Sequence, residues 1–220
     1  MKYMKLNIFV LFFGGFLFRV AIVNAQTNLP RIPEKSFYYL PELQLIASQL
    51  DGDNASGYNK FGFLAQVNLG WKQNQEQTWE LSIGFSERGS RRGYNPDIPG
   101  LNPFHIRYRS VETSLNYGFP LNSLKQSWDI PLDLFAGLRM GRLIQIEDTE
   151  RYALYLDEVY RPYTISLEVG ARYPVNDHWA LSVRANYSAV SMLKKGASSN
   201  PLYPTGVYNN AIGLGFIYVP

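Results

Sequence analysis

The chain has 220 residues and no cysteine, which excludes disulfides, thiolate metal sites and cysteine nucleophiles. It carries 21 basic and 18 acidic residues, but three of the bases, Lys2, Lys5 and Arg19, lie in the first 25 residues, where there is no acid. Without these three bases the remaining chain is neutral. The net charge therefore gives no support for nucleic-acid binding, and we expect no nucleic-acid partner.

The N-terminal segment has the pattern of a secretory signal peptide. Two lysines precede an apolar run over residues 6–18, and Val23-Asn24-Ala25 supplies the small residues of a cleavage site. A membrane anchor is the alternative, but Arg19 ends the run below the roughly 20 residues that a spanning helix needs. We predict a signal peptide over residues 1–25, cleavage after Ala25, and a periplasmic lead-in over residues 26–36.

Residues 37–220 form one predicted domain with eight segments in which apolar and polar side chains alternate. The alternation is clearest over residues 163–173, where every odd position is apolar or aromatic. A period of two predicts strands with one apolar face and one polar face. In chain order the predicted strands cover residues 37–48, 61–71, 79–86, 104–119, 128–143, 163–173, 179–188 and 208–218.

The connections between these strands alternate in length. Long polar connections are expected at residues 51–59, 88–103, 144–161 and 191–205, and short ones at residues 72–77, 120–127 and 174–177. Eight strands of about ten residues predict an all-β fold, an eight-stranded antiparallel up-and-down transmembrane β-barrel preceded by a signal peptide. Bacterial barrels of this kind have short periplasmic turns and long extracellular loops. The expected location is the cell outer membrane, with both termini in the periplasm.

A secreted lipocalin-like binding barrel is the alternative eight-stranded fold, with its apolar residues inside. The alternation alone does not say which face points outward. Aromatic residues near the strand ends resemble the girdles at the two interfaces of a membrane barrel and favour the membrane interpretation. They are Trp71, Trp79, Tyr173, Trp179, Tyr187 and Tyr218.

Four motifs resemble the PorT-like outer-membrane β-barrel family across essentially the whole mature chain. Phe85-Ser86-Glu87-Arg88-Gly89 resembles the run that ends that family's third strand, and residues 108–115 are similar to its Tyr-Leu-Glu-Ile-Pro-Leu strand, with Ser114 in place of the proline. The other matches are Gly170, Tyr173, Trp179, Arg184 and Tyr187 in one hairpin and residues 213–218 in the last strand. The resemblance implies the barrel fold. For function it implies only a link to protein secretion in the founding member, because most relatives have no assigned activity.

The polar faces of the strands collect seven charged residues that we expect inside the barrel. They are Glu80, Glu112, Asp133, Arg139, Glu168, Arg172 and Arg184. An eight-stranded barrel has an interior just wide enough to be filled by side chains, and paired charges avoid the penalty of isolated buried ions. We therefore predict a structural charge network in the barrel interior, with a small-solute channel as the alternative.

Signals for catalysis are few. A hydrolase needs a Ser–His pair oriented by a third polar group. His178 lies in a predicted periplasmic turn, and His105 lies near the outer rim with Ser110 five residues on. The segment 51–54 lacks the ligand pattern of a calcium loop. We predict a non-enzymatic protein with no catalytic residue, no metal site and no cofactor.

The second long connection contains three arginines, Arg88, Arg91 and Arg92. Guanidinium groups match the geometry of phosphate, so these residues are candidate lipopolysaccharide contacts, with a merely solvated loop as the alternative. The expected partners are outer-membrane lipid, lipopolysaccharide and secretion or surface proteins that the extracellular loops contact.

Overall fold

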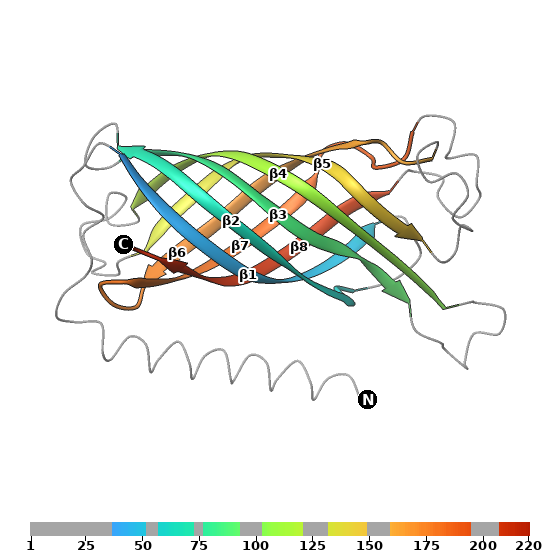
Figure 1. Cartoon of the computed structure of the whole chain (residues 1–220), viewed down its shortest axis with the longest axis horizontal. Coiled ribbons are helices and arrows are strands. Elements are labelled where there is room, and N and C mark those ends of the chain that lie inside the picture. Colours follow the sequence, from blue (N-terminus) through green and yellow to red (C-terminus); the bar gives the residue numbers. More distant parts are fainter. Residues whose placement is uncertain are drawn as a thin grey trace, which may run out of the picture.

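The computed structural model describes residues 37–51, 57–72, 77–92, 103–120, 132–148, 159–194 and 207–220. They contain eight strands: β1 (Phe37–Asp51), β2 (Lys60–Lys72), β3 (Thr78–Arg92), β4 (Phe104–Pro120), β5 (Asp133–Asp148), β6 (Tyr163–Pro174), β7 (Trp179–Ser188) and β8 (Tyr208–Tyr218). Each strand pairs antiparallel with the next, and β8 pairs with β1 to close the barrel (Figure 1). The predicted signal peptide and lead-in lie outside the described residues. Among the described residues, no helix has the length and hydropathy to cross a membrane.

The two ends of the barrel differ in what they hold. Strand β1 begins and β8 ends at the left end of the barrel in Figure 1, which we call the terminal end. At the opposite end, the distal end, β1 finishes at Asp51 and β8 begins at Tyr208. The connections at residues 73–77 and 175–178 belong to the terminal end, and those at residues 93–103 and 189–207 belong to the distal end.

Three strand boundaries differ from the predicted ones by more than three residues, namely the end of β3 and both ends of β5. The predicted connection at residues 88–103 begins too early, because β3 continues to Arg92 and its ladder with β4 extends to the pair Arg92↔Phe104. The Gly and Pro residues that suggested a loop lie mostly beyond that point. Strand β5 begins at Asp133, so the connection after β4 covers residues 121–132 and is not short as expected.

A bulge explains why β5 continues past its predicted end. Arg109 pairs with Gln145 and Ser110 pairs with Leu143, which leaves Ile144 without a partner in the β4–β5 ladder. An extra residue in one strand shifts the alternation by one position. The apolar period therefore breaks at residue 144, although the strand continues to Asp148.

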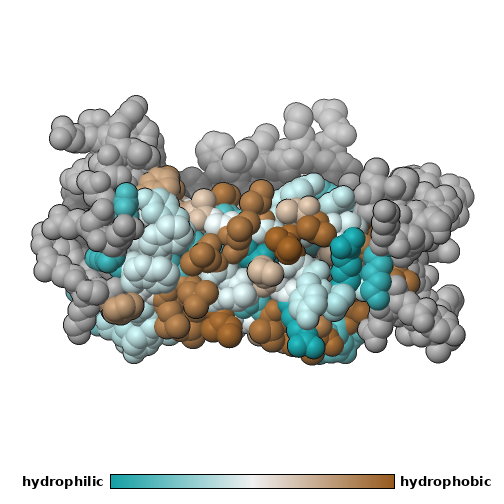
Figure 2. Space-filling view, turned by 90° about the horizontal axis from the view of Figure 1, so that it is seen from above, coloured by the Kyte–Doolittle hydropathy of each residue, from teal (hydrophilic) through white to brown (hydrophobic). Residues whose placement is uncertain are grey.

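The apolar faces of the strands point outward and the polar faces point inward. The outward side chains Leu43, Leu138 and Leu214 are 61%, 54% and 58% exposed, whereas the inward Glu168 and Arg184 are each 1% exposed. Apolar residues gather across the middle of the visible face in Figure 2. This arrangement confirms the predicted orientation of the strands. It is opposite to that of a lipocalin, so the lipocalin-like alternative is wrong.

Aromatic side chains cluster at the terminal end of the outer wall. Trp71 stacks on Trp79 with ring centroids 6.4 Å apart, and Tyr117 meets Trp79 edge-on at 5.1 Å. Trp179 meets Tyr218 edge-on at 5.3 Å. These contacts form two groups of aromatic rings at this end, one on β2, β3 and β4 and one on β7 and β8.

Candidate functional site

The interior of the barrel contains a buried network of charged side chains. Eight charged residues are at most 6% exposed: Glu42, Glu80, Arg88, Glu112, Arg139, Glu168, Arg172 and Arg184. Four carry a positive charge and four a negative charge. The network they form is therefore neutral.

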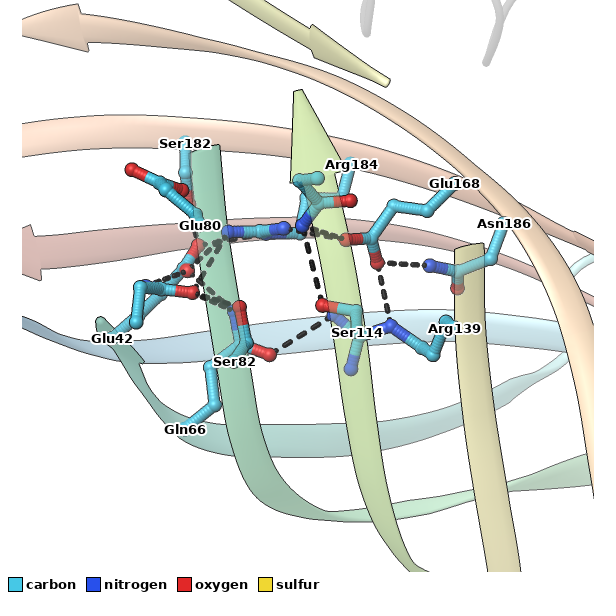
Figure 3. A network of polar contacts seen from close by, with 12 residues as sticks. Glu42, Gln66, Glu80, Ser82, Ser114, Arg139, Glu168, Ser182, Arg184 and Asn186 are labelled. Carbon is cyan, nitrogen blue, oxygen red and sulfur yellow. Dashed lines mark hydrogen bonds and ion pairs between the residues drawn. The ribbon is translucent and has the colours of Figure 1, made fainter. Parts of the chain in front are cut away.

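Six of these residues form one chain of alternating sign across the lumen. Its N–O distances are 2.8 Å for Arg88 with Glu112, 2.9 Å for Glu112 with Arg139, 2.6 Å for Arg139 with Glu168, 2.7 Å for Glu168 with Arg184, and 2.6 Å for Arg184 with Glu42. Figure 3 shows Arg139 and Arg184 converging on Glu168. Each inner member of the chain is held by two neighbours of opposite charge.

The other two charges form a separate pair nearer the terminal end. Arg172 donates two hydrogen bonds to Glu80, and the Tyr38 hydroxyl donates to the same carboxylate at 2.7 Å. The Phe135 ring lies between the pair and the chain, with its centroid 4.9 Å from Arg172 Cζ and 4.4 Å from Arg184 Cζ. Cation–π contacts therefore connect the two groups.

Neutral side chains complete the coordination of the carboxylates. Glu168 accepts from Asn116 and Asn186, each at 2.9 Å, and Glu112 accepts from Ser86 at 2.7 Å. Additional hydrogen bonds of this kind offset the desolvation cost of a buried ion pair. The exceptions on the guanidinium groups are Arg88 Nε and Arg172 Nε, which have no partner among the described residues.

Two glycines make room for the aromatic members of the network. A Cβ atom at Gly70 would lie 2.0 Å from the Tyr38 ring, and one at Gly170 would lie 2.2 Å from Phe135 Cζ. Real Cβ atoms do not approach this closely. The absence of a side chain at these two inward positions therefore allows the rings to reach across the lumen.

Apolar clusters lie on both sides of the charges. At the distal end the buried cluster contains Leu50, Ile106, Tyr108, Tyr160, Met192, Leu193 and Val207. A short bridge between the connections holds it in place, because Arg161 N donates to Met192 O at 2.7 Å and Lys194 N donates to Val159 O at 2.9 Å. At the terminal end, Tyr38, Leu40, Ala180 and Ile217 form a second cluster.

Six of the seven charges predicted in the interior lie in this network: Glu80, Glu112, Arg139, Glu168, Arg172 and Arg184. The seventh, Asp133, lies at the start of β5, half-buried and opposite Arg172 in the register with β6. It makes no ion pair with another described residue. Asp133 therefore lies at the edge of the network.

Sequence reasoning missed two members of the network, Glu42 and Arg88. Glu42 lies in β1, whose alternation is the weakest in the chain, so no face was assigned to it. Arg88 was expected in a loop as a lipopolysaccharide contact, but it is 2% exposed inside the barrel and donates to Asn186 Oδ1 at 2.9 Å. That expectation is wrong because β3 continues and keeps even positions inward. The inward alternation of Glu80, Ser82 and Ser86, carried one step further, would have placed Arg88 correctly.

The remaining candidates of the second connection lie at the end of β3. Arg91 is exposed, and the side chain of Arg92 lies outside the description. The backbone of Arg92 still pairs with that of Phe104. Of the three arginines, Arg91 is therefore the one whose described position fits a surface contact.

The structure does not assemble a catalytic Ser–His pair from the two candidates named above. Ser110 is fully buried and bonds Ser86 and Glu112 inside the lumen, whereas His105 faces outward from the same strand. His178 is exposed beside Val219 O in the β6–β7 connection. Within the described ranges, no three His, Cys, Asp or Glu side chains gather in a way that could hold a metal ion.

No family model and no curated protein matches the chain. Among solved structures it is similar to Ail, the attachment invasion locus protein of Yersinia pestis, in complex with the heparin analogue sucrose octasulfate, with 10% identity, a TM-score of 0.45 and coverage of 84% of this chain and 99% of that one. It is also similar to Neisserial surface protein A, with 14% identity, a TM-score of 0.42 and coverage of 84% and 98%. A third structure is the outer membrane protein OprG from Pseudomonas aeruginosa, with 10% identity, a TM-score of 0.41 and coverage of 84% and 95%. The fold described above rests on this chain's own strand pairing, and the PorT-like resemblance stays a prediction.

Proposed function

We propose that the chain is a non-enzymatic outer-membrane β-barrel protein that acts as a structural or interaction component. The observation that carries this proposal is the inverted polarity of the barrel. Its exposed outer wall is apolar, and its lumen is filled by a neutral charge network. A soluble protein rarely leaves so large an apolar surface in water, whereas a bilayer solvates it.

The filled lumen also limits where function can lie. Charged side chains occupy its middle, and apolar clusters lie on both sides of them. Solute conduction therefore has no support from the geometry. The surfaces that remain are the outer wall and the distal connections, through which the protein would contact secretion or surface components.

The proposed orientation places the terminal end in the periplasm and the distal end outside the cell. The signal peptide is predicted to be removed after Ala25. In this orientation the lead-in at residues 26–36 then precedes β1 on the periplasmic side. Two of the three terminal connections, at residues 73–77 and 175–178, are short, and they support this orientation because short turns face the periplasm in such barrels; the third, at residues 121–132, is longer.

The test is to express the full chain in a Gram-negative host, separate the inner and outer membranes on a density gradient, and sequence the N-terminus. We expect the protein in the outer membrane, resistant to alkaline extraction and beginning at Gln26. Recovery in the soluble periplasm would contradict the membrane proposal. An intact Met1 would contradict the predicted cleavage alone.

A further inference from the structure

On three neighbouring strands, β3, β4 and β5, the outward side chains change from apolar to charged at the same height along the barrel. On β4 the outward residues from Val111 to Phe119 are mainly apolar, and nearer the distal end they become Arg109, Arg107 and His105. The same change occurs on β3 after Phe85 and on β5 after Met140. The outer wall of these strands is therefore charged on the distal side of its band of apolar side chains, which we call the apolar belt.

Register places the charged residues of this face side by side. Arg109 lies between Glu87 on β3 and Gln145 on β5. Its Nε donates to Glu87 at 3.0 Å and its Nη1 to Gln145 at 2.9 Å. Lys60 approaches the same Glu87 at 3.2 Å. These contacts form a continuous row of polar side chains on the outer wall, from β2 across β3 and β4 to β5.

A second row of such contacts lies at the next outward positions toward the distal end. Arg107 lies opposite Glu147 and donates to it through Nε at 3.0 Å. Two further arginines, Arg91 and Arg142, are exposed on β3 and β5. We call Arg91, Arg107, Arg109 and Arg142 the basic arc. These four outward bases, together with Lys60, whose side chain is 12% exposed against Glu87, face two acids, Glu87 and Glu147, so this part of the outer wall is net positive.

On the other half of the distal rim the outward strand positions carry no base, and the described bases there, Arg161 and Lys194, lie in the connections. The outward strand residues at this level of β6, β7, β8 and β1 are Tyr163, Tyr187, Tyr208, Asn210, Gln49 and Asp51. Asp51 accepts hydrogen bonds from both Gln49 and Asn210. The described strands therefore carry outward bases at the distal rim on one side of the barrel alone.

The paired arginines of the arc keep donors for a ligand. Arg109 Nη2 and Arg107 Nη1 make no hydrogen bond to a described residue, and their side chains are 36% and 32% exposed. The carboxylates of Glu87 and Glu147 hold both guanidinium groups against the wall. Arg142 pairs with Val111 in the β4–β5 register and therefore lies at the distal margin of the apolar belt. The N–H donors of a guanidinium group match the geometry of phosphate oxygens.

We propose that the basic arc binds the phosphate groups of lipopolysaccharide in the leaflet at the distal end. The inference rests on the proposed membrane location and adds a site and a ligand to it. A lipid is the fitting source because the arc faces radially outward, directly beyond the apolar wall. A headgroup phosphate held there leaves its acyl chains beside Phe85, Val111 and Met140.

The experiment measures binding of bisphosphorylated lipid A, its dephosphorylated form and inorganic phosphate to the folded mature protein in zwitterionic detergent. We expect the double variant Arg107→Gln/Arg109→Gln to bind bisphosphorylated lipid A about 30-fold more weakly, from a roughly fivefold contribution per basic side chain at a charged membrane surface. The control Arg161→Gln/Lys194→Gln removes the same charge elsewhere and should stay within about twofold of the unaltered protein. Arg142→Gln breaks no described ion pair and should weaken binding about fivefold.

Three results would overturn the inference. The first is equal binding of the phosphorylated and dephosphorylated lipids. The second is loss of affinity in the control variant equal to that in the arc variants. The third is inorganic phosphate binding as tightly as lipid A with the same dependence on the arc, which would assign the site to a soluble anion. A barrel that folds and resists alkaline extraction but shows any of these keeps its proposed function and loses only the lipid site.

Discussion

The lumen network and the basic arc are two Arg–Glu systems that share strands β3, β4 and β5 and are separated by the thickness of the barrel wall. In the lumen, Glu168 is 1% exposed and accepts from two arginines, and the eight charges sum to zero. On the arc, Arg109 is 36% exposed and the bases outnumber the acids. Burial and charge balance, not the type of residue pair, decide the role. A balanced buried network supports the fold, and an unbalanced exposed one is free to bind.

The largest expected difference between the two systems lies in the free energy of unfolding. Glu168→Leu leaves Arg139 and Arg184 buried without their shared carboxylate and should cost about 3–5 kcal/mol. Glu147→Leu removes an exposed partner of Arg107 on the arc and should cost at most about 1 kcal/mol. Urea unfolding of the two variants in lipid vesicles measures both values. Equal costs would show that burial does not separate the two systems.

A second difference concerns depth along the outer wall. Val183 lies in the middle of β7 and is 49% exposed, whereas Tyr187 lies near the distal end of the same strand and is 51% exposed. Val183→Arg should cost about 2–4 kcal/mol in a bilayer, because the charge meets hydrocarbon, and Tyr187→Arg about 0–1 kcal/mol. The yield and stability of folding into vesicles provide the measurement. If both variants fold equally well, the wall at Val183 is not in contact with lipid.

The smallest expected signal is electrical. A lumen filled by paired charges between apolar clusters should give no step-like conductance when the purified protein is added to a planar bilayer. Insertion is verified in parallel by protection of the barrel from protease. Reproducible unitary steps from inserted protein would favour the small-solute channel instead and would require the network to rearrange.

The predicted alternation was sufficient for the strands and for most of the lumen charges, because a period of two is a local property of the chain. It assigned Glu112, Arg139 and Arg184 to one face without any knowledge of their partners. It failed at Arg88, where Gly and Pro residues nearby suggested a loop although the ladder with β4 continues. It also failed in β5, where the bulge at residue 144 reverses the alternation.

The sequence by itself determined that this chain forms about eight two-faced strands, since side-chain alternation depends only on neighbouring residues. The tertiary structure alone decided which face points outward, because either polarity satisfies the same pattern. It also decided which charges meet. Glu42 reaches Arg184 across 142 positions of the chain, and Arg107 reaches Glu147 only through the β4–β5 register. Such contacts depend on barrel closure and strand stagger, which are properties of the assembled sheet.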